Sequence, residues 1–215
     1  MDAPYRTLAG RGAAETRVRA SRFIAVAGPA RDEAQARDLL DAEQRRWFDA
    51  THHCSAWRLH DGAWRANDAG EPAGSAGAPI LAAIDAAGLE DCVVVVTRYF
   101  GGTKLGVGGL ARAYAEAAAL ALEAAPRRAA IPALELRVRY PYDQTAAVMR
   151  LMERYALGRP EHGYTAGGAS GEVRFAVARD AVAALTGALR DRTAGAAKLE
   201  TLGQCVLYHP AGPAA

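Results

Sequence analysis

The amino-acid sequence predicts an α+β fold with two domains, and three observations lead to this prediction. The run 93–96 consists of four valines, which are β-branched and too few for a helix, so it predicts a strand buried on both faces. Residues 127–132 contain two arginines and a proline and follow Pro126, which is a composition typical of a linker. Beyond them, the residue pattern follows the β-α-β-β-α-β order of a ferredoxin-like split βαβ domain.

These observations divide the chain into a first domain at 17–126, a linker at 127–132 and a second domain at 133–209. We expect residues 1–16 and 210–215 to be tails. The elements predicted for the first domain are, in order, a strand at 17–27, a helix at 32–48, a hairpin of 55–59 and 63–66, a helix at 79–87, the valine strand, and a helix at 110–123. The elements predicted for the second are a strand at 133–140, a helix at 144–155, strands at 157–165 and 172–178, a helix at 180–190, and a strand at 198–208.

Local signals support these boundaries. Asp32 is a suitable N-cap for the first helix, because its carboxylate can accept from backbone N–H groups of the first turn. Asp61-Gly62 is a favoured hairpin turn, and Pro79 suits the first turn of a helix. In the last helix of the first domain, Leu110 and Tyr114 begin an apolar row with i, i+4, i+7 spacing, which Pro126 terminates.

The segment 97–114, TRYFGGTKLGVGGLARAY, carries the most specific chemistry in the chain. Its glycines lie between the valine strand and the next helix, so the loop opens a helix N-terminus, where backbone N–H groups and a partial positive charge favour phosphate or carboxylate. The chain has only two lysines, and one of them is in this loop. The alternative is a tight turn with solvated cations. The predicted phosphate ligands are Arg98, Gly101, Gly102, Lys104, Gly106, Gly108, Gly109 and Arg112.

This segment resembles the signature of the IMPACT/YigZ family. Residues 67–79, NDAGEPAGSAGAP, are similar to the family's acidic-glycine loop, DDGEPSGTAGKP, and residues 50–56, ATHHCSA, to its ATHNCYA segment. The chain departs from the family pattern as follows: Ala69 replaces an acid, Ala73 a serine, Ser75 a threonine, Ala78 a basic residue and His53 an asparagine. These departures put the chemistry of the acidic-glycine loop in doubt.

The resemblance implies a fold for each domain. The first is expected to resemble the second domain of a small-subunit ribosomal protein and domain IV of elongation factor G, a fold that small-molecule kinases also use. YigZ-type bacterial members carry a second domain similar to domain V of elongation factor G. The eukaryotic IMPACT protein restrains a stress-kinase pathway that controls translation initiation, but the protein-binding module that it adds is absent here.

Two carboxylates in the acidic-glycine loop allow two interpretations. Asp68 and Glu71 could supply a general base or Mg²⁺ ligands beside the basic loop, because phosphate chemistry needs both a charge clamp and an acid. Alternatively, Asp68 organises the turn and Glu71 pairs with Arg98 or Arg112. We favour the second interpretation slightly, because the motif places no clear nucleophile and the catalytic residues stay unknown.

Several other side chains near these motifs could take part in a site. His52 is expected to hydrogen-bond to the acidic-glycine loop or a ligand, and Ser75 is a weak nucleophile candidate. His52, His53 and Cys54 do not predict zinc, because adjacent strand residues point to opposite faces. Neither a metal nor a cofactor is therefore predicted. Residues 106–111 fit the G-x-G-x-x-A dinucleotide fingerprint, but the valine strand ends several residues before them, whereas that fingerprint follows its strand directly. The position of Lys104 does not fit the spacing of a P-loop. The residues that could stack on bases are Tyr99, Phe100 and Tyr114.

Composition sets broader limits on location and partners. No signal peptide or membrane-helix pattern is evident, so a cytoplasmic location is expected. The three cysteines lie far apart and are expected to be reduced. The net charge of +2 is too small for strong non-specific nucleic-acid binding, so a basic patch has to come from local clustering.

Three function hypotheses follow from the sequence. The first is a cytoplasmic, non-catalytic, translation-associated protein that recognises RNA, a ribosome-associated factor or another phosphate-bearing partner through the glycine loop. The second is an enzyme acting on a small phosphorylated or anionic substrate, with Asp68 or Glu71 as base or metal ligand. The third is a scaffold that binds an acidic protein partner through its second domain. The oligomeric state is not predicted.

Overall fold

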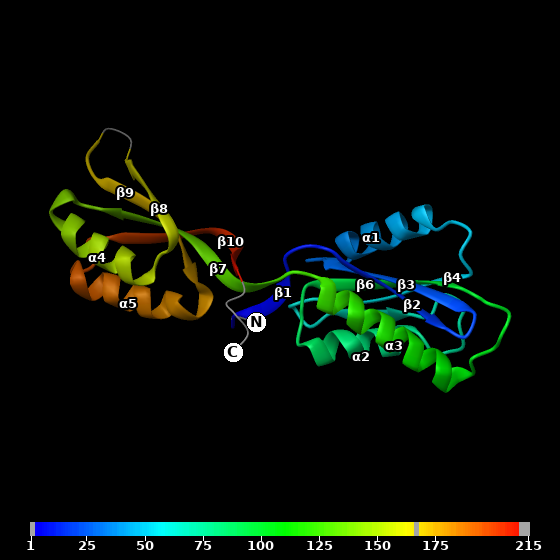
Figure 1. The fold of residues 1–215 in the computed structure, drawn as a ribbon. Helices are drawn as coiled ribbons and strands as arrows, with labels where there is room; N and C mark the ends of the chain where they lie inside the picture. The colour runs from blue at the N-terminus through cyan, green and yellow to red at the C-terminus, as the bar shows by residue number, and fades with distance from the viewer. Residues whose placement is uncertain (1–2, 166–167, 211–215) are drawn as a thin grey trace. The chain divides into compact units, whose positions relative to one another are not determined.

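The computed structural model describes residues 3–165 and 168–210, which fall into two compact units. The N-terminal unit comprises residues 5–129 and the C-terminal unit residues 130–209. Figure 1 shows the elements of both units. The N-terminal unit contains β1 (Tyr5–Leu8), β2 (Gly12–Val18), β3 (Ser21–Pro29), α1 (Glu33–Arg46), β4 (His52–Arg58), β5 (Trp64–Asn67), α2 (Gly77–Ala87), β6 (Cys92–Tyr99) and α3 (Val107–Ala124).

The main sheet of the N-terminal unit is antiparallel and has the strand order β2-β3-β6-β4-β5. Helix α1 covers one face of this sheet, and α2 and α3 cover the other (Figure 1). Val94 and Val96 of β6 pack in the core with α2 and α3, whereas Val93 and Val95 pack with α1. All four valines are at most 1% exposed, which confirms the prediction of a strand buried on both faces.

The C-terminal unit has the predicted β-α-β-β-α-β order. Its elements are β7 (Arg127–Tyr140), α4 (Thr145–Tyr155), β8 (Leu157–Tyr164), β9 (Gly171–Ala178), α5 (Val182–Arg192) and β10 (Lys198–Pro210). Short 3₁₀ turns at Tyr142–Gln144 and Arg179–Ala181 precede the two helices. Strand β7 pairs with β10 and β9, and β9 pairs with β8, which is the split βαβ arrangement. The predicted two-domain α+β fold is confirmed.

The helices of the C-terminal unit cover one face of its sheet. Val148 and Leu151 of α4 and Leu185 of α5 share one buried cluster with Leu136 and Phe175 from the strands. The apolar alternation along β7 and β9 places these strand residues on a common face. This unit therefore has a core of its own, separate from the clusters of the N-terminal unit.

Two predicted boundaries are wrong. Residues 1–16 are not simply a tail, because they contain β1 and most of β2, and β2 forms a hairpin with β3. The hairpin turn interrupts the single strand expected at 17–27, and Arg19 adopts a φ of 52° there. The small residues of β2, GAAETRV, gave too weak an apolar alternation to indicate a strand.

The predicted linker at 127–132 is also wrong, because these residues begin β7. The ladder between β7 and β9 starts at Ala133, one residue after Pro132, so the missing N–H of the proline removes no bond from that ladder. Of the expected tail at 210–215, Pro210 ends β10 and residues 211–215 lie outside the described part of the chain.

Candidate functional site

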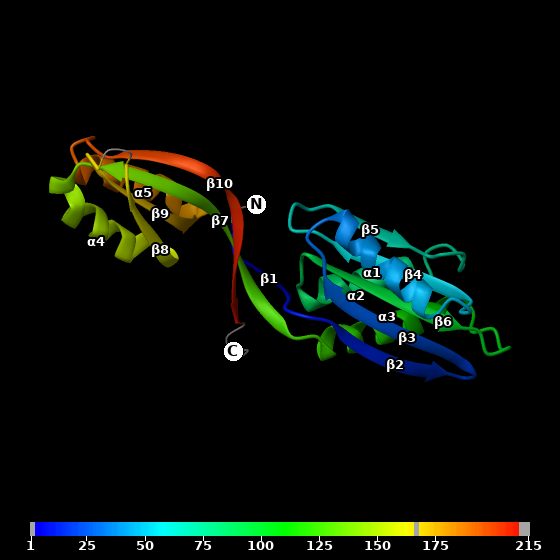
Figure 2. The same cartoon turned by 90° about the horizontal axis from the view of Figure 1, so that it is seen from above.

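Three segments that are far apart in sequence meet at one end of the N-terminal sheet. His52, the first residue of β4, pairs with Arg98 near the end of β6. The acidic-glycine loop, residues 68–76, follows β5 at the same end, because Asn67 pairs with Ser55 of β4. The glycine loop, residues 101–109, leaves β6 there and leads into α3, as both views of the ribbon show (Figures 1 and 2).

Glu71 is the centre of a buried polar network at this end. Its Oε1 accepts a hydrogen bond from Arg98 Nη1 at 2.7 Å and another from the Tyr114 hydroxyl at 2.7 Å. The side chains of Arg98 and Glu71 are only 5% and 3% exposed. Arg98 Nη2 also donates to Ser21 Oγ at 3.2 Å. Glu71 thus joins the acidic-glycine loop to β6 and α3 through one oxygen atom, and Arg98 extends the network to Ser21 of β3.

Tyr114 and Cys54 extend this network into the core. Burial raises the pKa of Tyr114 well above its ordinary value, so its hydroxyl remains a donor to Glu71. Burial also raises the pKa of the Cys54 thiol to about 12. The Cys54 Sγ lies 3.0 Å from the backbone carbonyl of Asp68 and 3.4 Å from the Tyr114 hydroxyl. Cys54 is therefore a neutral structural donor rather than a reactive thiol.

Asp68 organises the acidic-glycine loop through backbone hydrogen bonds. Its carboxylate accepts from the N–H groups of Gly74, Ala76 and Gly77 at 2.8, 2.9 and 2.8 Å. Ala76 is the N-cap residue of α2 and offers no capping side chain, so Asp68 caps this helix from outside it. Burial opposes the charged form of Asp68, but the three backbone donors outweigh this effect and lower its pKa.

His52 supports the same loop. Its Nδ1 lies 2.9 Å from the carbonyl oxygen of Ala69, and this oxygen can only accept, so Nδ1 carries the proton. The other ring nitrogen, Nε2, lies 4.0 Å from Glu71 Oε1. Ser75, the weak nucleophile candidate, is fully buried, and its hydroxyl has no hydrogen-bond partner among the described residues. Its burial leaves it no access to a substrate.

The glycine loop presents a different kind of surface. Gly106 is the N-cap residue of α3 with a φ of 71°, a conformation that favours glycine, and no side chain caps the helix. A Cβ on Gly101 would lie 2.0 Å from the Ala20 carbonyl, so the loop packs directly on the β2–β3 turn. Lys104 and Arg112 are exposed and form no ion pair within 3–165 and 168–210.

The structure changes the roles of two predicted site residues. Arg98 was expected to bind phosphate, but it is 4% exposed and its guanidinium is engaged by Glu71 and Ser21, so this prediction is wrong. Tyr114 was expected as a possible stacking residue, but it is fully buried and a base cannot reach its ring. Both belong to the internal network. The exposed part of the predicted site consists of Gly102, Lys104, Gly106, Gly108 and Arg112, with Gly101 and Gly109 partly exposed.

Sequence reasoning missed three contributors to this end of the sheet. Ser21 was not singled out, although it anchors both Arg98 and, through its Oγ at 3.3 Å, the backbone N–H of Gly101. Arg19 donates from Nη1 to the Lys104 carbonyl at 3.1 Å and adds a cation beside the glycine loop. The exposed Phe48 lies in the turn after α1. No motif marked these residues, because only the fold brings them to the glycine loop.

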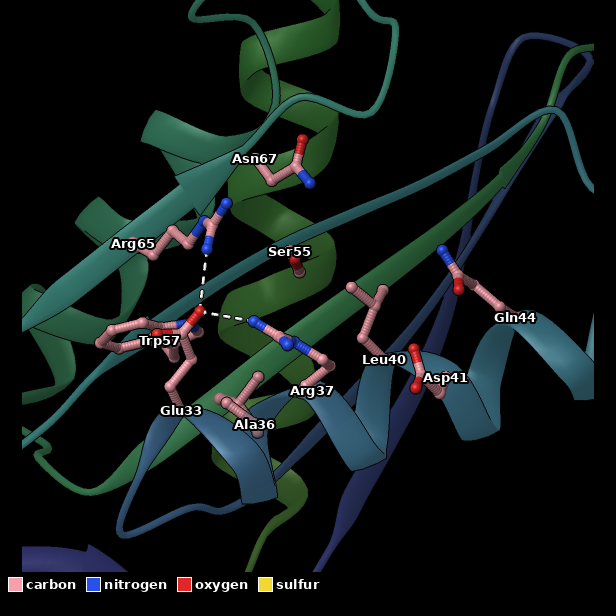
Figure 3. Close-up of a pocket in the computed structure, with 11 residues that line it drawn as sticks. Glu33, Ala36, Arg37, Leu40, Asp41, Gln44, Ser55, Trp57, Arg65 and Asn67 are labelled. Carbon is pink, nitrogen blue, oxygen red and sulfur yellow. Dashed lines mark hydrogen bonds and ion pairs between the residues drawn. The ribbon is translucent and has the colours of Figure 1, made fainter.

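A pocket of about 290 Å³ lies on the other face of the sheet, between α1 and strands β4 and β5 (Figure 3). Glu33 of α1 spans its mouth and accepts from Arg37 at 2.8 Å and from Arg65 of β5 at 2.9 Å. Trp57 and Ala36 also line it. None of the predicted site residues lines this pocket, so it is separate from the candidate site.

Within residues 3–165 and 168–210, no three His, Cys, Asp or Glu side chains gather in a metal-binding cluster. In β4, His53 points to the face opposite Cys54, and burial lowers the pKa of His53. Over the same part of the chain, each helix is too short or too polar to span a bilayer.

Comparisons with known proteins agree with the sequence motifs. A family model described as the Impact N-terminal domain matches residues 19–122. The "IMPACT family member in pol 5'region" of Thermus thermophilus is 39% identical over 160 residues, which are 74% of this chain and 84% of that protein. The IMPACT family member YvyE of Bacillus subtilis is 40% identical over 112 residues, about half of each chain. YigZ of Escherichia coli is 32% identical over 139 residues, 63% of this chain and 68% of YigZ.

A solved structure also resembles the whole chain. It bears the name "Crystal structure of an hypothetical protein", has a TM-score of 0.64 and is 27% identical, and the match covers 91% of this chain and 96% of the other. The likeness therefore includes both units. Because the Thermus thermophilus relative matches over most of both proteins, the chain belongs to the IMPACT family.

Proposed function

We propose that this protein is a non-catalytic, translation-associated binding protein that recognises RNA or another phosphate-bearing partner through the glycine loop. One observation carries the proposal: the two acids of the acidic-glycine loop are engaged in hydrogen bonds within the fold, whereas the cations Lys104 and Arg112 are exposed. The outward chemistry of the motif is therefore basic and suits an anionic partner.

The N-terminus of α3 adds to this surface. It has no capping side chain and no acid in its first turn, so its backbone N–H groups have no built-in acceptor of their own. A phosphate oxygen is a suitable acceptor for such groups, and Lys104 and Arg112 lie before and after them in sequence. The exposed Arg19 lies beside Lys104. A link to translation is supported by the resemblance of both domains to parts of elongation factor G.

The enzyme hypothesis loses its proposed base in this arrangement. Glu71 is buried and paired with Arg98, and Asp68 holds three backbone N–H groups. A general base has to reach a substrate proton, but the Glu71 side chain is only 3% exposed and the Asp68 carboxylate is occupied by backbone donors. We therefore favour binding over catalysis.

The test is fluorescence anisotropy with labelled single-stranded and structured RNA across a salt series. For about three phosphate contacts, the log–log slope of the binding constant against salt is roughly −2. The variant Lys104→Ala/Arg112→Ala should bind at least roughly tenfold more weakly, and its slope should fall toward about −0.7, the value for one contact.

The matched control is Arg159→Ala/Lys198→Ala, which removes one exposed arginine and one exposed lysine from the C-terminal unit. It changes the net charge by the same amount and should leave binding unchanged. Equal losses in both double variants would show that only bulk charge matters. Wild-type protein that stays silent at micromolar concentration would sink the RNA proposal and redirect the search to small phosphorylated ligands or protein partners.

A further inference from the structure

Exposed aromatic rings lie beside the glycine loop. Phe48, in the turn after α1, is 84% exposed, and Phe100, at the end of β6, is 45% exposed. We call these two rings, together with Trp47 and Tyr99, the aromatic platform. Single exposed apolar residues are common, but exposed aromatic residues on two segments that are held side by side indicate an interaction site.

Hydrogen bonds hold the turn after α1 against the end of β6. The Tyr99 hydroxyl donates to Asp49 at 2.6 Å, the Phe100 N–H donates to Thr51 Oγ1 at 3.0 Å, and the Thr51 N–H donates to the Arg98 carbonyl at 2.9 Å. The rings of Trp47 and Tyr99 also meet edge to face, with centroids 6.4 Å apart. The aromatic platform is therefore a fixed surface, and Phe100 directly precedes the first residue of the glycine loop.

Arginines surround the aromatic platform. The Arg22 guanidinium lies 5.4 Å from the Trp47 ring centroid and 5.9 Å from that of Tyr99, and the Arg46 guanidinium lies 5.0 Å from Trp47. Arg22 also pairs with Glu15 at 2.7 Å, so its charge is partly balanced. Arg46 has no ion pair within 3–165 and 168–210. The surroundings of the rings thus favour an anionic partner over a neutral or cationic one.

We propose that the aromatic platform stacks unpaired bases of a single-stranded nucleic acid whose phosphates lie on the glycine loop. This inference rests on the proposed function and specifies its partner. Trp47 and Tyr99 are only partly exposed, whereas Phe48 and Phe100 are exposed, so Phe48 and Phe100 are the rings that receive bases. The Arg98 guanidinium lies 5.4 Å from the Phe100 ring centroid, but Arg98 is itself only 4% exposed and leaves the outer part of that ring open. Bases in a duplex are stacked on one another and cannot reach these rings, whereas a single strand offers free base faces and phosphates together.

The test compares three probes of equal length and label on the full chain: an oligouridylate, an abasic strand with the same phosphates, and a duplex RNA. Anisotropy is measured for the wild type and for Phe48→Ala/Phe100→Ala. Base stacking contributes ~1 kcal/mol or more per base, so losing two stacks should weaken oligouridylate binding roughly 25-fold. Binding of the abasic strand should stay unchanged. The variant Phe48→Tyr/Phe100→Tyr, which keeps both rings, should retain the wild-type affinity for oligouridylate.

Trp64→Ala is the matched control, because Trp64 is 58% exposed in β5, where it pairs with Arg58 rather than with the loop end of β4. It should bind all three probes as the wild type does. If the alanine variant does not fold, Phe48→Leu/Phe100→Leu keeps apolar bulk without rings and should show the same loss.

The outcomes separate this inference from the proposed function. The stacking inference is overturned if Phe48→Ala/Phe100→Ala binds oligouridylate with wild-type affinity. It is also overturned if this variant loses as much affinity for the abasic strand as for oligouridylate. If Lys104→Ala/Arg112→Ala still weakens binding in that case, the glycine-loop proposal stands. Wild-type protein that binds none of the probes overturns both, and preference for the duplex overturns the single-strand assignment alone.

Discussion

The ion pair between Glu71 and Arg98 allows a sharp test of the internal network. Substituting Glu71→Gln keeps an acceptor oxygen of similar shape but removes the negative charge. Arg98 then remains 4% exposed without a carboxylate to balance it, because the amide oxygen that accepts from Arg98 and from the Tyr114 hydroxyl is uncharged. We expect the N-terminal unit to lose stability through this uncompensated buried charge.

The magnitude follows from burial rather than from distance. Removing one partner of a buried ion pair costs about 3–5 kcal/mol, and the retained acceptor places Glu71→Gln near ~3 kcal/mol. A loss of this size is a large fraction of a typical domain stability of about 5–15 kcal/mol. It corresponds to a fall in Tm of roughly 10 °C.

Urea unfolding followed by tryptophan emission measures this loss of stability specifically in the N-terminal unit. The three tryptophans, Trp47, Trp57 and Trp64, all lie in the N-terminal unit, so their emission reports its unfolding alone. This matters because a two-domain chain does not unfold as a single two-state system. The free energy of unfolding is compared between wild type and variant at matched slopes.

Glu15→Gln is the matched control in the same unit. Glu15 pairs with Arg22 at 2.7 Å, the same separation as in the buried pair, but both side chains are more than a third exposed. Solvent screens this pair, so the control should unfold at the wild-type urea midpoint. If Glu71→Gln unfolds at the same urea midpoint as the Glu15→Gln control, the buried network is not a source of stability.

Two further predictions follow. The folded-state pKa of Asp68 is lowered, so its stabilisation is complete above about pH 4 and is lost as pH falls through the folded pKa. Asp68→Asn should therefore show a shallower fall of the urea midpoint on acidification, and parallel curves would contradict this. Burial raises the pKa of the Cys54 and Cys92 thiols to about 12, whereas Cys205 is only partly buried. A thiol reagent at neutral pH should label Cys205 first and the other two only in urea, and equal native rates would contradict it.

The sequence was informative wherever a local pattern determined the structure. Four consecutive valines indicated the central strand, and Asp32 caps α1 by accepting from the Gln35 N–H at 2.8 Å, as its position predicted. The period of α3 also held the information needed to correct one error. Tyr114 lies on the same helix face as Leu110 and Ala117, which are buried, so its position in this apolar row already predicted a buried ring that no base can reach.

Strand parity held a similar signal for Arg98. Successive strand residues alternate between faces, so Arg98 lies on the same face as Val94 and Val96, which are fully buried. The sequence could not show what compensates this buried charge, because Glu71 is 27 positions away and Ser21 is 77 positions away. Pairings of that kind depend on tertiary contacts rather than on local propensity.

Only half of the aromatic platform could be predicted from the sequence. Tyr99 and Phe100 were predicted as possible stacking residues, but Trp47 and Phe48 were placed at the end of a predicted helix and no motif marked them. Only the hydrogen bonds from Tyr99 and Phe100 to Asp49 and Thr51 place them beside the glycine loop.

The carboxylates of Asp68 and Glu71 hold the acidic-glycine loop in place through hydrogen bonds within the N-terminal unit. Its outer positions are therefore free to change without disturbing these hydrogen bonds. Ala73 of the loop and Ala78 in the first turn of α2 are exposed, and they stand where the family pattern has a serine and a basic residue. In this chain the exposed positions lack these polar side chains, whereas the hydrogen bonds of Asp68 and Glu71 remain. A partner that distinguishes this protein from its relatives would therefore do so at the exposed positions.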